Sequence, residues 1–168
     1  MRMQDMIAEA VLASKAGMAR YLAGFSDETR ARQAPGLPNH VAWSLGHCAL
    51  TLHRVAEKLD GRGLPESEFG VGGERFDAES VAFGSVPIGD AARYPALSRC
   101  VAIYDGACDR LAGAVRASDE ARLMESTRWG EVELPLWLLV LRMGFHNGMH
   151  TGQVADLRRA LGFRSIFA

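Results

Sequence analysis

The sequence has little lysine, few cysteines and no long apolar run. Its 168 residues carry 19 basic and 20 acidic side chains, for a formal net charge of -1, and lysine occurs only as Lys15 and Lys58. Without a basic patch the chain lacks the electrostatic attraction that dominates binding to phosphate backbones, so we expect no nucleic-acid partner. The longest apolar run, Leu134 to Leu141, is too short to span a bilayer, so we expect no membrane partner.

The three cysteines, Cys48, Cys100 and Cys108, have no CxxC spacing and do not form a disulfide framework. Cys48 and Cys108 fall on apolar helical stripes, where a buried thiol is the usual interpretation. Free thiols suit a reducing compartment, and Met1 to Glu9 lacks the apolar core of a signal peptide. We therefore expect a cytoplasmic protein.

The length and composition are those of one globular domain. The chain is 48% hydrophobic and 23% charged, close to the average for soluble proteins. A chain of this size buries enough surface to fold around one core, so residues 1–168 are expected to form a single domain.

Four segments have the apolar spacing of helices. They run from about Met3 to Phe25, His40 to Leu59, Pro95 to Ala117 and Pro135 to Gly162. No segment alternates convincingly as a strand does. The simplest fold class is an all-α four-helix bundle.

The second of these segments has the clearest seam. Asn39 is its expected N-cap, and Gly61 lies just past its expected end. Its apolar residues recur at spacings of four and three, at Val41, Leu45, Cys48, Leu52, Val55 and Leu59. This pattern predicts one face packed against a partner helix.

The connection from Gly61 to Arg93 contains seven glycines and is too long for a tight turn. We interpret it as one long crossover between the second and third helices. The start of the fourth helix, Leu136 to Phe145, is apolar almost all round, which predicts burial on more than one side, at the bundle centre or at a subunit interface.

The fourth helix carries His146 and His150, four residues apart. That spacing places both imidazoles on one face, one turn apart, where two rings can ligate one metal ion. A hydrogen-bonded or partly exposed pair is the alternative. Two ligands hold a metal weakly, so a third is expected from elsewhere in the chain.

The remaining histidines all lie on the second helix, and geometry allows only one of them to join the site. His40 and His47 share a face but are separated by about 10 Å of helix rise, and His53 points away from both. Spacing alone leaves His40 and His47 almost equally eligible. The ordinary interpretation of His40 and His53 is a surface or boundary side chain.

Two motifs resemble the DinB/YfiT-like family of proposed metalloenzymes. One is Trp43-Ser44-Leu45-Gly46-His47-Cys48-Ala49, and the other runs from His146-Asn147-Gly148-Met149-His150-Thr151-Gly152-Gln153 to Arg159. The segments 83–87 and 94–97, Phe-Gly-Ser-Val-Pro and Tyr-Pro-Ala-Leu, are also similar to family members. The resemblance spans roughly residues 34–162.

The resemblance implies an up-down-down-up bundle, frequently a homodimer, with a divalent metal held by His47, His146 and His150. It also implies a small-molecule substrate, since characterised relatives include transferases that use low-molecular-weight thiols. Imidazole ligands suit Zn, Ni, Fe or Co, with Mn as a further candidate.

Such a site supports two chemistries, because a bound thiol or water loses its proton more readily. The hypothesis is therefore a metal-dependent thiol S-transferase or hydrolase. The alternative is a metal-binding helical bundle that acts as a non-catalytic binding or dimerisation module.

Several side chains are candidates for supporting roles. Gln153, one turn beyond His150, can orient a ligand, and Trp43 can wall a cleft or pack in the core. Arginines near the histidines can hold a substrate carboxylate or lie on the surface as ordinary charges. These arginines are Arg142, Arg158 and Arg159. The candidate general bases are Glu74, Asp77 and Glu79, but a position in a solvated loop is the better interpretation of all three.

Overall fold

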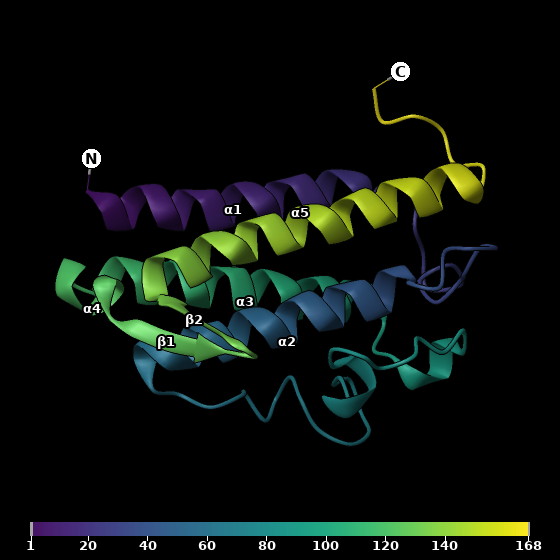
Figure 1. Cartoon of the computed structure of the whole chain (residues 1–168). Helices are drawn as coiled ribbons and strands as arrows, with labels where there is room; N and C mark the ends of the chain where they lie inside the picture. Colours follow the sequence, from purple (N-terminus) through teal and green to yellow (C-terminus); the bar gives the residue numbers. More distant parts are fainter. Residues whose placement is uncertain (1, 168) are drawn as a thin grey trace.

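The computed structural model describes residues 2–167, which are mostly helical (Figure 1). The long helices are α1 (Met3–Tyr21), α2 (Val41–Asp60), α3 (Leu97–Ala117) and α5 (Leu136–Ala160). A short helix, α4 (Glu120–Met124), precedes strands β1 (Ser126–Trp129) and β2 (Val132–Pro135). Two 3-10 turns, η1 (Glu79–Val81) and η2 (Ala91–Arg93), lie between α2 and α3.

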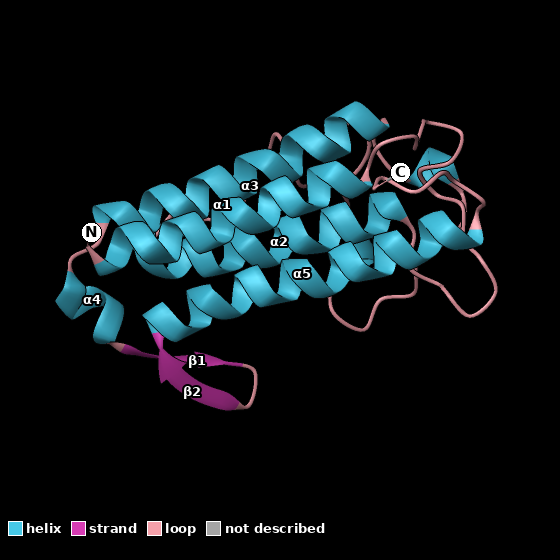
Figure 2. Cartoon of the chain, turned by 90° about the horizontal axis from the view of Figure 1, so that it is seen from above, coloured by secondary structure: helices cyan, strands magenta, loops and turns pink. Residues whose placement is uncertain are grey.

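Each long helix packs against two others, in the cyclic order α1, α5, α2 and α3 (Figures 1 and 2). Helices α1 and α5 run in the same direction, since Ser14 meets Asn147 and Met18 meets Thr151. The four-helix core is thus present. The complete up-down-down-up order stays a prediction.

The expectation that the chain contains no strand is wrong. Strands β1 and β2 form an antiparallel hairpin in which Trp129 pairs with Val132. Gly130 takes the left-handed conformation at the turn, with φ of 60°. Four-residue strands are too short to show clear alternation, and a single glycine such as Gly130 is a weak turn signal. The hairpin lies beside the start of α5 (Figure 2).

Helix α2 confirms the predicted seam. Val41, Leu45, Cys48, Leu52 and Val55 are fully buried. Gly61 ends the helix in the left-handed conformation, with φ of 71°, and its N–H donates to the Glu57 carbonyl. The N-cap is His40 rather than Asn39, because the His40 Nδ1 atom accepts from the Trp43 N–H.

The long connection after α2 is largely irregular, as predicted, but charged contacts fix its first part. Arg110 of α3 donates to the Asp60 carboxylate at 2.9 Å and to the Gly63 carbonyl at 3.1 Å. His53 of α2 binds Glu68 of the connection at 2.7 Å. The connection is therefore held against both α2 and α3.

The first half of α5 is less enclosed than its apolar sequence predicts. Leu139, Val140 and Met143 are buried, but Arg142 is exposed and Phe145 is 71% exposed. The face that carries Arg142 turns toward a cavity between α5 and α2. Burial on more than one side therefore holds only for part of this segment.

All three cysteines are buried free thiols, which confirms the interpretation of Cys48 and Cys108. Burial raises the pKa of Cys48 well above its usual value and raises the pKa values of Cys100 and Cys108 to about 12. Within residues 2–167, no helix combines the length and the apolar character needed to cross a membrane.

Candidate metal centre

Three histidines from two helices converge on one point between α2 and α5. The Nε2 atom of His146 lies 3.1 Å from that of His47 and 3.2 Å from that of His150. The structure thus brings together the three residues that the sequence and the family resemblance named as ligands. That they bind a metal stays a prediction.

His47 is fixed by the connection that follows α2. Its Nδ1 atom lies 2.8 Å from the Val81 carbonyl of η1. A carbonyl only accepts, so Nδ1 carries the proton and Nε2 presents a lone pair. Trp43, one turn earlier on α2, stacks on the His47 ring, with centroids 4.7 Å apart. Trp43 is buried, so it serves both the core and the site.

His150 is fixed by Gln153, as the spacing had suggested. The His150 Nδ1 atom lies 2.9 Å from Gln153 Oε1, which also accepts from Asn39 Nδ2 at 3.0 Å. An amide oxygen only accepts, so the Nε2 atom of His150 also presents a lone pair. Asn39 therefore supports the site from the chain just before α2.

His146 stands between the other two rings, and its own Nδ1 atom is buried without a hydrogen-bond partner within residues 2–167. A neutral imidazole has one N–H, so His146 can donate to only one of the two lone pairs that face it. At least one lone pair therefore lacks a partner. A cation at the point of convergence satisfies all three Nε2 atoms together.

The protonation states suit a cation as well. Burial, followed by the neighbouring imidazoles, lowers the pKa of His146 to about 3. The same two causes lower the pKa of His150 to about 4, and burial lowers that of His47. All three rings are neutral near pH 7 and are ready to ligate.

The spacing of the nitrogen atoms fits a first-row metal ion. Two imidazole nitrogens on one tetrahedral zinc lie about 3.4 Å apart, since each is about 2.1 Å from the ion. The separations of 3.1 and 3.2 Å around His146 are close to that value. The site can therefore hold one divalent ion.

His40 and His53 do not join this site, and both are buried, whereas a surface or boundary position was the ordinary interpretation. His40 is fully buried, and its ring bridges the start of α2 and the Ile88 carbonyl at 3.0 Å. His53 is 2% exposed and lies between Glu68 and Arg110. Each imidazole has a partner for both nitrogens, which permits its burial.

The three candidate bases lie in different surroundings. Glu79 lines the cavity beside the histidines. Glu74 instead accepts from the Ala96 N–H, and Asp77 accepts from the N–H of Glu79. Of the acids that the sequence offered, only Glu79 is placed at the site.

The three candidate arginines also lie in different surroundings. Arg142 lines the cavity. Arg158 is buried and donates to the carbonyls of Tyr21 and Ala23, and Arg159 pairs with Asp156 on the surface. The last two have structural or surface roles.

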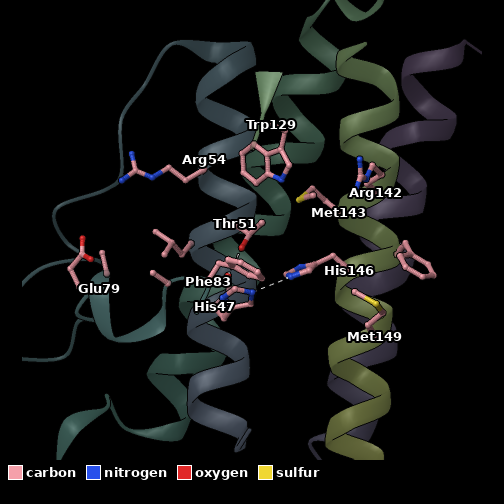
Figure 3. Close-up of a pocket in the computed structure, with 14 residues that line it drawn as sticks. His47, Thr51, Arg54, Glu79, Phe83, Trp129, Arg142, Met143, His146 and Met149 are labelled. Atoms are coloured by element: carbon pink, nitrogen blue, oxygen red, sulfur yellow. Dashed lines mark hydrogen bonds between the residues drawn. The ribbon is translucent and has the colours of Figure 1, made fainter. Parts of the chain in front are cut away.

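A cavity of about 530 Å³ opens beside His47 and His146 (Figure 3). Sequence reasoning missed most of its walls, which come from α2, η1, the 82–83 segment, the hairpin and α5. Trp129 is the clearest case, because its place beside the histidines depends on how the hairpin folds back. Phe83 stood in a segment that resembles the family but had no assigned role.

The fold and this histidine cluster define the class of protein. The chain belongs to the DinB superfamily, whose family model matches residues 12–154. The crystal structure of a conserved protein from Enterococcus faecalis is similar, with a TM-score of 0.74 and 15% sequence identity. The alignment covers 95% of this chain and 97% of that protein. This likeness shows the fold alone. No curated protein matches the chain.

Proposed function

We propose that the chain is a metal-dependent enzyme in which His47, His146 and His150 hold one divalent ion. The convergence of three Nε2 atoms carries this proposal. Zinc, nickel, iron, cobalt and manganese are the candidates, because all accept imidazole ligands. A divalent ion in this position supplies a Lewis acid that lowers the pKa of a water molecule or a thiol.

The reaction we propose is either transfer of a thiol sulfur to an electrophile or hydrolysis. In both cases a small molecule occupies the cavity that His47 and His146 line. Low-molecular-weight thiols are one class of substrate. Apolar side chains line much of this cavity, while Val81 and Gln153 hold the rings of His47 and His150 in place. The carboxylate of Glu79 lies on the side of the cavity away from the histidines (Figure 3), so we assign it no step in the reaction.

Metal content tests the first part of this proposal. Tag-free protein, purified without chelator and dialysed, should carry about one ion per chain by elemental analysis. His146→Ala and His150→Ala should lose most of it, whereas His53→Gln, which removes a histidine outside the cluster, should keep it. Stoichiometric metal in both alanine variants would show that the site is wrong.

Activity tests the second part. Metal-loaded protein should turn over a member of a panel of electrophiles with several thiols, or a member of a panel of esters. His146→Ala should be inactive on the same compound. A protein that binds metal but turns over no compound would instead be the non-catalytic binding module.

We also propose that the protein is a homodimer. The start of α5 leaves apolar side chains incompletely covered, since Leu138 and Leu141 are only partly buried and Phe145 is 71% exposed. Light scattering should give twice the chain mass, and Leu138→Asp should give a monomer. A monomeric unaltered protein would exclude this proposal.

A further inference from the structure

The cavity beside the histidines has apolar walls and a charged end. Its apolar lining includes Leu50, Phe83, Trp129, Met143, Phe145 and Met149. Pockets of this size and composition bury the body of a small molecule and orient it through a few polar groups. The polar groups of this cavity therefore indicate what kind of molecule it takes.

Two arginines reach this cavity from opposite walls. Arg142 precedes His146 by four residues on α5, so it lies on the same helix face, about 6 Å further along the axis. Arg54 follows His47 by seven residues, two turns along α2. Figure 3 shows both arginines and Trp129 at the same end of the cavity, beyond the two histidines, with the Arg54 guanidinium pointing away from α5.

The charge of Arg142 is not neutralised by the protein. It forms no ion pair with any of residues 2–167. The two other arginines of α5 do have partners, since Arg158 binds backbone carbonyls and Arg159 binds Asp156. Arg54 has a contact of 3.4 Å to Glu57, with side chains that are 51% and 38% exposed. Such an exposed pair adds little and leaves Arg54 free to bind a ligand.

The cavity as a whole is cationic. Glu79 is its one acidic residue within the described chain, against two arginines and neutral histidines. A neighbouring depression shares Arg54 and Trp129 and adds Lys58 and Arg128 together with one acid, Glu57. An anionic group is therefore favoured at the arginine end.

We propose that this cavity binds a small carboxylate with an apolar aliphatic or aromatic body, whose carboxylate is held by Arg142. A guanidinium donates two parallel N–H groups to a carboxylate, while the apolar walls bury the rest of the molecule. Helices α2 and α5 line the cavity with mid-helix residues rather than with an N-terminus, so the guanidinium is the group that binds the anion. The far end of the molecule then lies against His47 and His146.

This inference deepens the proposed function and depends on it only for the reaction at that far end. Binding itself requires Arg142 and the apolar walls, so it can be measured without metal. The probes are 4-phenylbutanoate, its shorter and longer homologues, and the neutral amide 4-phenylbutanamide. Isothermal titration calorimetry is performed on both metal-free and zinc-loaded protein.

We expect the acid to bind more tightly than the amide in both forms of the protein. Arg142→Gln should weaken binding of the acid by about tenfold or more, because it removes a charge-assisted hydrogen bond, and should leave the amide unchanged. Arg142→Lys should recover only part of the loss, since it keeps the charge but not the planar fork. Arg159→Gln, an exposed charge on the same helix outside the cavity, is the matched control and should bind like the unaltered protein.

Three results would overturn the inference. One is equal binding of the acid and the amide. Another is acid binding that requires zinc and ignores Arg142→Gln, which would mean that the carboxylate ligates the ion instead. The third is no binding of any acid in the series. If the protein takes up no divalent ion at all but still binds the acid in a way that depends on Arg142, the proposed function fails and this inference stands.

Discussion

The indole ring of Trp43 lies parallel to the imidazole of His47, with an interplanar angle of 6° and ring centroids 4.7 Å apart. The indole N–H donates to the Ser80 carbonyl at 3.1 Å and to Ser85 Oγ at 3.0 Å. Helix α2 is therefore tied to η1 and to the segment just after it through the ring that supports His47. The orientation of a metal-ligand candidate thus depends on a side chain that does not line the cavity.

Replacing Trp43 should weaken both the fold and the metal site. Trp43→Leu removes a buried ring and should lower the free energy of unfolding by about 2–4 kcal/mol. It should also raise the zinc dissociation constant about tenfold, because His47 loses its stacked support. Denaturant unfolding and a competition titration for zinc measure the two effects. Trp137→Leu, a half-buried tryptophan on α5, is the control and should change stability without changing zinc affinity.

Gln153 should fix the tautomer of His150. Gln153→Leu removes the acceptor for the Nδ1 proton and should weaken zinc binding by about 10–100-fold. Gln153→Glu keeps an acceptor and should bind zinc at least as well as the unaltered protein. The Gln153 side chain is exposed, so the fold should tolerate either substitution. Equal zinc affinity in the leucine variant would contradict this role.

The segment between α2 and α3 packs closely against α2 at Gly46, so we expect this position to require glycine. A Cβ atom at Gly46 would lie 2.7 Å from the Phe76 ring and 3.0 Å from Val81. Gly46→Ala should therefore cost about 1–3 kcal/mol through overpacking, and it should disturb the Val81 carbonyl that holds His47. Gly113→Ala on α3 meets no atom within 4 Å, so it should be neutral or slightly stabilising. Thermal unfolding of the two variants side by side checks the difference.

The metal-free protein should lose stability as the pH falls from about 6.5 to about 4. Burial lowers the pKa of His40 to about 4, and burial with the neighbouring rings lowers that of His146 to about 3. In this pH range the unfolded chain binds protons at these histidines and the folded chain does not. The free energy of unfolding therefore keeps its full value above the ordinary histidine pKa and falls below it. Each such histidine contributes up to about 3 kcal/mol to the loss.

Urea unfolding at several pH values measures this slope. His40→Asn keeps a side chain that can cap α2 but removes a titrating ring, so it should flatten the slope. The same slope in the variant and in the unaltered protein would show that His40 does not contribute.

Asp60 forms ion pairs with Arg110 and Arg62, and we expect the two pairs to contribute unequally to the free energy of unfolding. Burial alone would raise the pKa of Asp60, but hydrogen bonds from Arg110 and from the Arg62 backbone and side chain lower it. The Arg110 side chain is 10% exposed and also binds His53. Arg110→Ala should therefore cost about 3 kcal/mol, because it leaves buried groups unpaired. Arg62 is 71% exposed, so Arg62→Ala should cost less than about 1 kcal/mol. Denaturant unfolding distinguishes the two.

Local patterns in the sequence predicted the helices well but not the elements between them. The seam of α2 and its end at Gly61 follow from neighbouring residues and were found. Helix α4 and the hairpin are short, and packing against α5 stabilises them, so their local signals are weak. The burial of His40 and His53 was missed because their partners, Ile88, Glu68 and Arg110, lie far away in the sequence.

The sequence by itself determined that His146 and His150 share one helix face, since a four-residue spacing has that consequence in any α-helix. It left His40 and His47 almost equally eligible as the third ligand, and only the family resemblance favoured His47. The tertiary structure decided this point, because the packing of α2 on α5 sets which side chain faces the pair. It alone placed Arg142 and Trp129 at one cavity, since contacts between distant segments depend on how whole elements pack and not on local spacing.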